Sequence, residues 1–156
     1  MKLSREFFNR NPEIVARDLL GKILVKGNLK GKIVETEAYF TKNDKASHSF
    51  SRKKAKEFFE TKKPGTAYVY LNYGMYWLLN VITKDGAVLF RALEPISGID
   101  IMKKNRKTDD VLNLLSGPGK LTRALNIDKN YHGIDLINGH LNIQDNKDKI
   151  NVVKAK

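Results

Sequence analysis

The chain has 156 residues, enough for one domain with its own hydrophobic core and no need for disulfides or a structural metal. It contains no cysteine, which excludes thiol catalysis, disulfide scaffolds and cysteine-based metal centres. A net charge of +12, from 29 Lys and Arg against 17 Asp and Glu, predicts a polyanionic partner, either nucleic acid or an acidic membrane surface. A surface that is basic through composition alone is the alternative, so motifs must decide.

The N-terminal part begins with a helix signature. In NPEIVARDLLGK, Asn11 is a candidate N-cap, Pro12 suits the first helical position and Gly21 suits the C-terminal stop. Residues 22–40 then have β-branched runs on both sides of a Gly-Asn-Leu-Lys-Gly turn. This pattern predicts a β-hairpin.

Strands dominate the middle of the chain. The patterns of residues 66–74, 77–83 and 86–95 predict three strands, the last closed by Pro95. The basic stretch of residues 51–65, SRKKAKEFFETKKPG, precedes them. We interpret it as a long loop or an exposed helix.

Helices return in the C-terminal part. Apolar periodicity predicts helices over residues 98–107, 109–115 and 119–127, followed by a late hairpin over residues 131–145. No repeat, low-complexity tract or linker divides the chain. We therefore expect residues 1–156 to form a single α+β domain with a mostly antiparallel sheet.

Two carboxylates stand close together in KIVETEAYF. The alternation of a strand places Glu35, Glu37 and Tyr39 on one face. Val34 and Thr36 are expected on the opposite, core-facing side. A carboxylate beside an aromatic ring in a partly dry cleft is a candidate general base. The alternative is a pair of solvated edge-strand charges.

Two polar residues interrupt apolar strands. Arg91 lies in AVLFRALEP, where a buried guanidinium needs a carboxylate, with Glu35, Glu37 and Glu94 as candidates. Pairing with Glu37 would keep that carboxylate ionised and help to position a water. Asn80, in WLLNVIT, either contacts a ligand or makes a hydrogen bond at a sheet end.

The motif SGPGKL is similar to a phosphate-binding loop only in part. Leu114 stands in place of the first glycine and Leu121 in place of the Ser or Thr. Backbone N–H groups at Gly119 and the cation of Lys120 can still meet a DNA-backbone phosphate. A plain helix-entry turn is the alternative.

Membrane and metal functions are not expected. The N-terminal segment has no apolar stretch of signal-peptide length, and no stretch approaches the roughly 20 apolar residues that cross a bilayer. The three histidines, His48, His132 and His140, have no close metal-ligand spacing. We therefore expect a soluble protein with no metal, no other cofactor and no membrane partner.

Five blocks in order along the chain carry a family resemblance: IVETEAYF, ASHSF, PGTAYVYLNYGMYWLLNVIT, VLFRALEP and LLSGPGKLTRALNI. From about Val15 to Ile127, the sequence resembles the alkyladenine (3-methyladenine, methylpurine) DNA glycosylase family. The resemblance implies a curved antiparallel sheet and a monofunctional, metal-free enzyme. It implies excision of alkylated or deaminated purines, the class of 3-methyladenine, 7-methylguanine, hypoxanthine and ethenoadenine, from double-stranded DNA.

The resemblance also implies site residues. Glu37 matches the general base, Arg91 matches the arginine beside the catalytic water, and Tyr73 matches the side chain inserted into the duplex. The residues implied to hold the flipped base are Tyr39, His48, Tyr70 and Asn80. Within YVYLNYGMYW, the other aromatic residues Tyr68, Tyr76 and Trp77 are interpreted as core. The implied setting is a monomer in a bacterial cytoplasm, associated with the nucleoid.

The sequence departs from the family pattern in two places. The link after the histidine block keeps positive charge but not the family motif, and we expect the chain to lack the family's C-terminal segment. A truncated, non-catalytic DNA-binding remnant of the same fold is therefore the alternative function. A basic domain that binds RNA or an acidic membrane would explain the charge, but not the combination of Glu37, Arg91 and the tyrosines.

Overall fold

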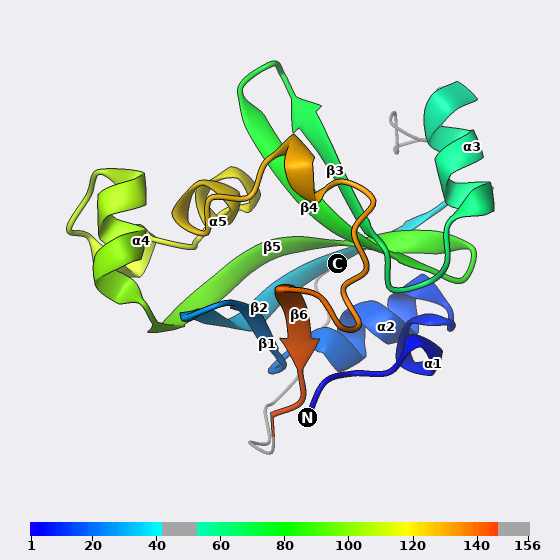
Figure 1. The fold of residues 1–156 in the computed structure, drawn as a ribbon, viewed down its shortest axis with the longest axis horizontal. Helices are drawn as coiled ribbons and strands as arrows, with labels where there is room; N and C mark the ends of the chain where they lie inside the picture. The colour runs from blue at the N-terminus through cyan, green and yellow to red at the C-terminus, as the bar shows by residue number, and fades with distance from the viewer. Residues whose placement is uncertain (42–52, 147–156) are drawn as a thin grey trace.

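The protein folds as a curled sheet with short helices packed around it (Figure 1). The structure, a computed structural model, describes residues 1–41 and 53–146. The strands are β1 Ile23–Lys26, β2 Leu29–Phe40, β3 Ala67–Asn72, β4 Tyr76–Thr83, β5 Gly86–Ser97 and β6 Leu141–Gln144. The helices are α1 Arg5–Phe8, α2 Pro12–Leu19, α3 Lys53–Thr61, α4 Ile99–Arg106 and α5 Pro118–Ala124, with 3₁₀ turns η2 Val111–Asn113 and η3 Lys129–Tyr131.

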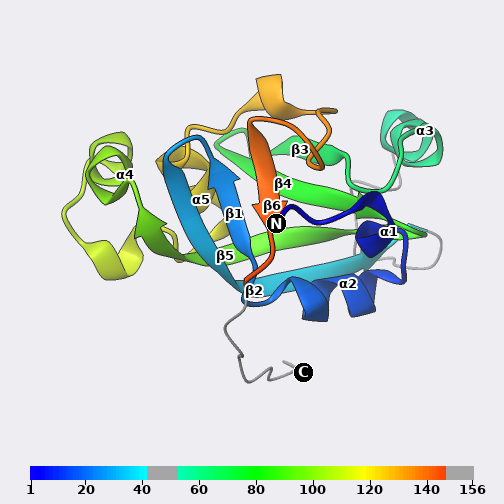
Figure 2. The same ribbon diagram turned by 60° about the horizontal axis from the view of Figure 1, so that its bottom comes forward.

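The six strands form one sheet in the order β3-β4-β5-β2-β1-β6, and every neighbouring pair is antiparallel. The sheet confirms the predicted α+β class. Strands β2 and β5 have 12 residues each and pair along almost their whole length. They cross the middle of the molecule, with α2 along one side (Figure 2).

Helix α2 forms as the sequence predicts. The Asn11 side chain accepts the backbone N–H of Glu13 at 2.8 Å, and Pro12 occupies the first turn. Past the helix end, Gly21 has a φ of 87°, a left-handed value that glycine adopts without strain. The helix buries Val15 and Leu19 completely in the main core. Its apolar stripe is thus what attaches it to the sheet.

The first hairpin has a shorter turn than predicted. Lys26 pairs with Leu29, so only Gly27 and Asn28 connect β1 to β2. The φ of Gly27 is 58°, which fits a tight two-residue hairpin connection. The second glycine of the predicted turn, Gly31, lies inside β2, where a Cβ atom would come within 3.0 Å of the Leu93 side chain.

Pro95 does not end its strand, contrary to the prediction. β5 continues to Ser97, and Pro95 pairs with Gly31 of β2. The pairing of β4 with β5 reaches only Leu89, so no β4 strand lies beside Pro95. The missing N–H of proline therefore breaks no ladder bond, as is typical of an edge position.

The C-terminal part confirms some predictions and corrects others. Helices α4 and α5 form where helical periodicity predicts them, and α3 realises the helix interpretation of the basic stretch. Residues 109–115 form only the short turn η2 instead of an α-helix. The predicted late hairpin is wrong: within residues 131–145 only β6 is a strand, and its ladder partner is β1. A partner distant in sequence replaced the local one.

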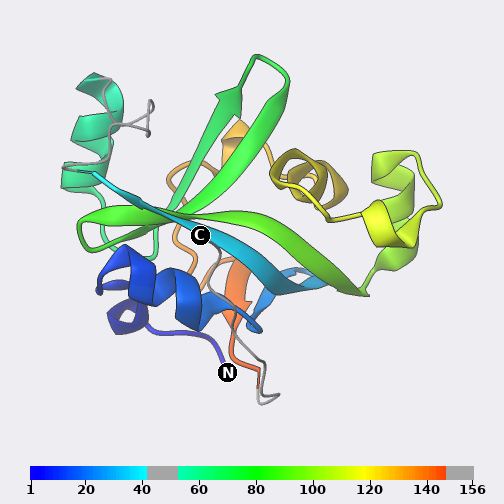
Figure 3. The same ribbon diagram turned by 180° about the vertical axis from the view of Figure 1, so that it is seen from behind.

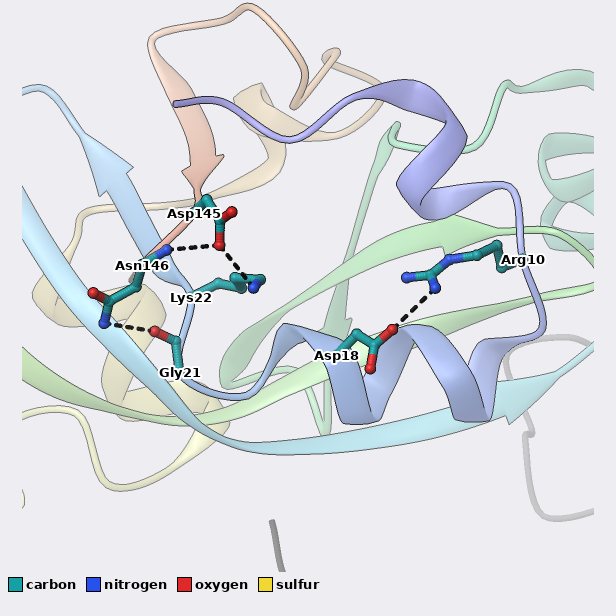
Figure 4. A network of polar contacts seen from close by, with 6 residues as sticks. All are labelled: Arg10, Asp18, Gly21, Lys22, Asp145 and Asn146. Carbon is teal, nitrogen blue, oxygen red and sulfur yellow. Dashed lines mark hydrogen bonds and ion pairs between the residues drawn. The ribbon is translucent and has the colours of Figure 1, made fainter. Parts of the chain in front are cut away.

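A polar network attaches the end of β6 to the turn before β1 (Figure 4). Lys22 Nζ lies 2.7 Å from Asp145 Oδ1, and Asn146 donates to the carbonyl that precedes Lys22 at 2.9 Å. The hydrogen bond from Lys22, together with the backbone N–H of Asn146, lowers the pKa of Asp145. A second ion pair, at 2.9 Å, joins Arg10 to Asp18 of α2. Both ion pairs are partly exposed, so they fix the orientation of the segments that they join but add little to the free energy of unfolding.

His132 covers the outer edge of β3. Its Nδ1 accepts the backbone N–H of Val69 at 3.0 Å, and its ring stacks on Phe58 of α3 with 4.3 Å between ring centroids. Burial lowers the pKa of His132, and the nearby charge of Lys62 lowers it further. One neutral imidazole therefore joins α3 to the edge strand and occupies a backbone donor that would otherwise be open.

The stability of the protein is expected to fall as the pH drops below about 6.5, the ordinary histidine pKa. Because the folded state disfavours protonated His132, the unfolded state binds more protons in this range. His132→Asn keeps an acceptor near the Nδ1 position but does not titrate. Urea unfolding at pH 7.5 and pH 5.0 should show a smaller acid-induced loss of unfolding free energy for the variant than for the unaltered protein. The two losses should differ by less than about 1.4 kcal/mol per pH unit, which is the limit for one proton. Equal losses would contradict the assignment.

Candidate active site

One face of the sheet is apolar and packs in the main core, whereas the opposite face carries polar and aromatic side chains. A row of cross-strand pairs runs over β3, β4, β5 and β2 on that second face. In this row Tyr68 pairs with Asn80, Asn80 with Leu89, and Leu89 with Glu37. Partners in an antiparallel ladder project to the same side, so four strands contribute to one surface. We define this row and its neighbours Tyr39, Tyr70 and Arg91 as the candidate site.

The ladder between β2 and β5 is irregular beside this row. The pairing skips Val34 on β2 and Arg91 on β5. Ile33 is fully buried before the irregularity, and Thr36 donates to the Ala16 carbonyl of α2 at 2.8 Å after it. The inward positions of β2 therefore change from odd to even. Thr36 faces inward as predicted, but Val34 does not: it is 41% exposed, because the irregularity adds a residue to the outer face.

Glu37 is held on both of its carboxylate oxygens. Tyr39 donates its hydroxyl to Oε1, and Arg91 donates Nη1 to Oε2. The predicted pairing of Arg91 with Glu37 is therefore observed. The hydrogen bond to Glu37 raises the pKa of Arg91, and the charges of Glu37 and Glu35 act in the same direction against partial burial. The guanidinium stays charged and fixes the carboxylate in place.

Arg91 is not buried, contrary to the expectation from its apolar neighbours. Its side chain is 47% exposed, whereas Phe90 is fully buried and Ala92 nearly so. The irregular pairing turns the side chain onto the mixed face, as bulges do next to many functional sites. Arg91 is therefore accessible to a ligand while it contacts Glu37.

Two further site residues, Asn80 on β4 and Tyr70 on β3, lie two and three strands away from Glu37 on β2. Tyr70 is half-buried and its ring centroid lies 5.4 Å from that of Tyr68. Asn80 is 3% exposed and donates Nδ2 to the Tyr68 carbonyl at 3.2 Å. Tyr68 itself packs under Phe58 and Phe59 of α3, which confirms its interpretation as core. Sequence reasoning missed Leu89, although its spacing of two from Arg91 already predicts the same face.

Tyr73 lies at the tip of the β3–β4 hairpin, which projects from the rest of the molecule (Figure 3). Its φ is 54° and that of Gly74 is 65°, and the Met75 N–H donates to the Asn72 carbonyl at 3.0 Å, the pattern of a type I′ turn. A positive φ is unfavourable for an aromatic residue. Tyr73 is nevertheless 87% exposed, so no packing explains its presence. Strained, exposed residues of this kind mark candidate functional positions.

The β4 strand of this hairpin rests on α5 just after the turn, at Tyr76 and Trp77. A Cβ atom at Gly119 would lie 2.6 Å from the ring of Tyr76, so glycine allows a close approach there. The Thr122 hydroxyl also donates to the Trp77 carbonyl at 2.7 Å. Trp77 is partly buried against the core as expected, but Tyr76 is 42% exposed and is not a core residue. Lys120 is exposed on the same helix. Gly119, the second glycine of SGPGKL, therefore has a packing role that the sequence did not predict.

Some expectations meet the limits of the described residues. His48 lies in residues 42–52, outside the part of the chain that the structure describes. Across residues 1–41 and 53–146, no three His, Asp or Glu side chains gather in a way that could hold a metal ion. None of the helices in these same ranges has the length and apolarity to span a membrane.

Comparison with known proteins gives two findings. Residues 6–156 match the family model described as methylpurine-DNA glycosylase. Among curated relatives, a protein of Clostridium tetani is 49% identical over all of this chain and 86% of its own length. Proteins of Prosthecochloris aestuarii and Clostridium novyi are 48% and 44% identical over 86% and 99% of this chain, and 69% and 85% of their own lengths. All three carry the provisional name 3-methyladenine DNA glycosylase.

Both findings indicate one class of protein, the DNA glycosylases, which are DNA-repair hydrolases of N-glycosyl bonds. Within that class, the chain belongs to the methylpurine-DNA glycosylase family. The earlier resemblance is thereby confirmed at the level of the family.

Gly119→Ala should destabilise the protein by about 1–3 kcal/mol, because the added methyl overlaps Tyr76 near the root of its side chain. Gly117→Ala is the matched control: its Cβ would meet only the Lys120 side chain, at an ordinary 3.6 Å. Urea unfolding of the two variants measures the difference. Equal stability of the two variants would show that the packing of the hairpin on α5 does not depend on this contact.

Proposed function

We propose that this protein is a DNA-repair N-glycosylase that flips alkylated or deaminated purines out of double-stranded DNA and hydrolyses their N-glycosidic bond. The proposed substrates are 3-methyladenine, 7-methylguanine, hypoxanthine and ethenoadenine lesions, and the product is an abasic site. One observation carries the proposal: the Glu37 carboxylate, which accepts hydrogen bonds from Tyr39 and Arg91, lies on a mixed sheet face that also carries Tyr70 and Asn80.

Glu37 is the proposed general base. It takes a proton from a water whose oxygen forms a bond to C1′ of the sugar, while the N-glycosidic bond breaks and its electron pair leaves with the purine. Arg91 is proposed to hold Glu37 and to orient the water, since its side chain is accessible and, among the described residues, only its Nη1 is used in a hydrogen bond. The transition state resembles an oxocarbenium ion, which two nearby carboxylate oxygens stabilise.

The flipped base is proposed to lie between aromatic rings. Tyr39 and Tyr70 belong to strands at opposite sides of the row, and Asn80 between them offers an amide for hydrogen bonding to the base. His48 completes this set by resemblance. Stacking supplies about 1–3 kcal/mol per contact, which offsets the few kcal/mol needed to flip a nucleotide.

Tyr73 is the proposed wedge that fills the space left by the flipped base. An exposed ring at the tip of a projecting hairpin suits insertion into a base stack, and its left-handed backbone is supported by the tight turn. Insertion would block the return of the base. The wedge and the base-holding Tyr70 stand three residues apart, so one hairpin serves both roles.

DNA-backbone contacts are proposed next to the wedge. A groove of about 560 Å³ lies between the hairpin and the α4–α5 region, and its lining includes Tyr76 and the cations Lys107 and Arg123. Lys120 extends this basic surface, and Gly119 contributes by allowing the hairpin to approach α5. Duplex DNA carries a dense negative charge, so each phosphate contact makes binding salt-sensitive. One duplex requires only a monomer.

Glu37→Gln should lower the single-turnover excision rate by about 10²- to 10⁴-fold, the usual contribution of a general base. Duplexes that each contain one of the four proposed lesions are incubated with the protein and then treated with alkali, which cleaves abasic sites. Binding to the same duplexes should survive, because glutamine keeps the shape of the side chain. The control is Glu94→Gln, because Glu94 is an exposed carboxylate of β5 that pairs with Lys32 at 3.7 Å.

The excision panel also separates the proposal from its alternative. If the unaltered protein yields no abasic product from any lesion but binds duplex DNA, the chain is a DNA-binding protein without turnover. If Glu37→Gln retains full activity, the residue is not the base.

Tyr73→Ala should leave the unfolding midpoint almost unchanged, because the ring is 87% exposed, yet lower excision of a base-paired lesion by about 10- to 100-fold. This range corresponds to the loss of about 1–3 kcal/mol of stacking. Excision from a single-stranded oligonucleotide, which has no stack to fill, should change much less. Tyr76→Ala is the comparison, since Tyr76 packs on Gly119 and its removal should affect stability. Identical profiles for the two variants would contradict a wedge role for Tyr73.

A further inference from the structure

Glu35 is a charged residue of the candidate site that the proposed reaction does not use. It lies on β2 two residues before Glu37 and pairs with Ala92, the neighbour of Arg91. The irregular ladder adds a residue to the outer face of each strand at this point, so Glu35 and Arg91 emerge side by side. The charge of Glu35 is close enough to act on the Arg91 guanidinium. Glu35 is exposed and has no ion pair within the described residues.

The charges of this cluster do not cancel. Within residues 1–41 and 53–146, Arg91 is the one cation that forms an ion pair with Glu37, through its Nη1. Glu35 and Glu37 together carry two negative charges against the single positive charge of Arg91. A protein with a net charge of +12 therefore has, counted over the residues that the structure describes, a negative cluster at its candidate site.

A surplus carboxylate on a DNA-binding face carries an energetic cost, because it repels phosphates. It cannot be explained as packing, since Glu35 is exposed, nor as a strand requirement, since glutamate is a poor strand former. The negative charge of Glu35 instead favours positive charge in the site, either on the bound base or on the sugar in the transition state.

We propose that Glu35 is a specificity-determining residue that favours purines carrying a positive charge over neutral purines; this inference rests on the proposed function. Alkylation at N3 or N7 makes the purine a cation, which leaves as a neutral base when the glycosidic bond breaks. A deaminated purine such as hypoxanthine is neutral and leaves with the bonding electron pair, so negative charge develops on it unless it gains a proton. A fixed carboxylate stabilises the first base and destabilises the second.

The electrostatic effect has a bounded size. Two charges about 7 Å apart near a solvated surface interact strongly enough to change a rate or affinity by about three- to ten-fold. Because Glu35 is exposed, salt should weaken the effect. A general loss of structure would alter both classes of lesion equally, whereas a field effect changes their ratio.

The test compares 7-methylguanine with hypoxanthine in the same duplex sequence under single-turnover conditions. For Glu35→Gln, the ratio of excision efficiencies, cationic over neutral, should fall by about three- to ten-fold relative to the unaltered protein. Excision of 7-methylguanine should decrease while that of hypoxanthine stays level or increases. Glu35→Asp, which keeps the charge, should restore most of the ratio, and added salt should reduce the difference between the unaltered protein and Glu35→Gln.

Glu94→Gln is the matched control, because it removes one carboxylate from the same pair of strands but on the side of Lys32. Its ratio should equal that of the unaltered protein. An unchanged ratio in Glu35→Gln, or an equal loss on both lesions, would overturn the inference and leave the proposed function intact. Absence of excision of both lesions by the unaltered protein would overturn the proposed function, and this inference with it.

Discussion

The ladder between β2 and β5 is the constraint on which the rest of the site depends. It fixes the carboxylate of Glu37 opposite Leu89 and brings Arg91 across from the neighbouring strand. The irregularity in the same ladder turns Arg91 outward while its neighbours remain in the core. In a regular ladder, neither β2 nor β5 would place an extra residue on the outer face of the sheet here. The ion pair is therefore a product of strand pairing over more than fifty positions of sequence, and bulges are a common means of aiming a side chain at a functional site.

Stability and chemistry are divided between the two faces of the sheet. The apolar face joins α2 and α5 in the main core, where residues such as Phe90 and Leu79 are fully buried. The other face is covered at one end by α3, through Phe58 and the His132 ring, and carries the candidate site at the other. The hairpin that bears Tyr73 projects from the molecule and is held against α5 through Gly119 and Tyr76, just behind its tip. Rigid support close behind an exposed ring is what the proposed wedge role of Tyr73 requires.

Electrostatics show a similar division. The protein as a whole is strongly basic, and this charge favours association with any stretch of DNA. Among the described residues, the candidate site carries the carboxylates of Glu35 and Glu37 against the single guanidinium of Arg91. Under the proposed function, attraction to the DNA backbone and preference for a cationic base are opposite demands, and separating the two charges in space satisfies both. In that proposal, long-range charge attracts the duplex, while short-range charge acts on the flipped nucleotide.

The sequence by itself determined the local features: the N-cap of α2 at Asn11, the strand alternation that puts Glu37 beside Tyr39, and the family to which the chain belongs. These follow from neighbouring residues or from ordered motifs, both of which are visible in one dimension. Tertiary structure decided what depends on distant partners. It moved β6 from a local hairpin to β1, and it let β5 continue through Pro95, beside which β4 no longer pairs. It also selected Glu37 among the three candidate partners of Arg91 and exposed Arg91 at an irregularity that spans two strands. The physical reason is that ladder register and close approaches are properties of pairs of segments, and periodicity within one segment contains no information about which partner it meets.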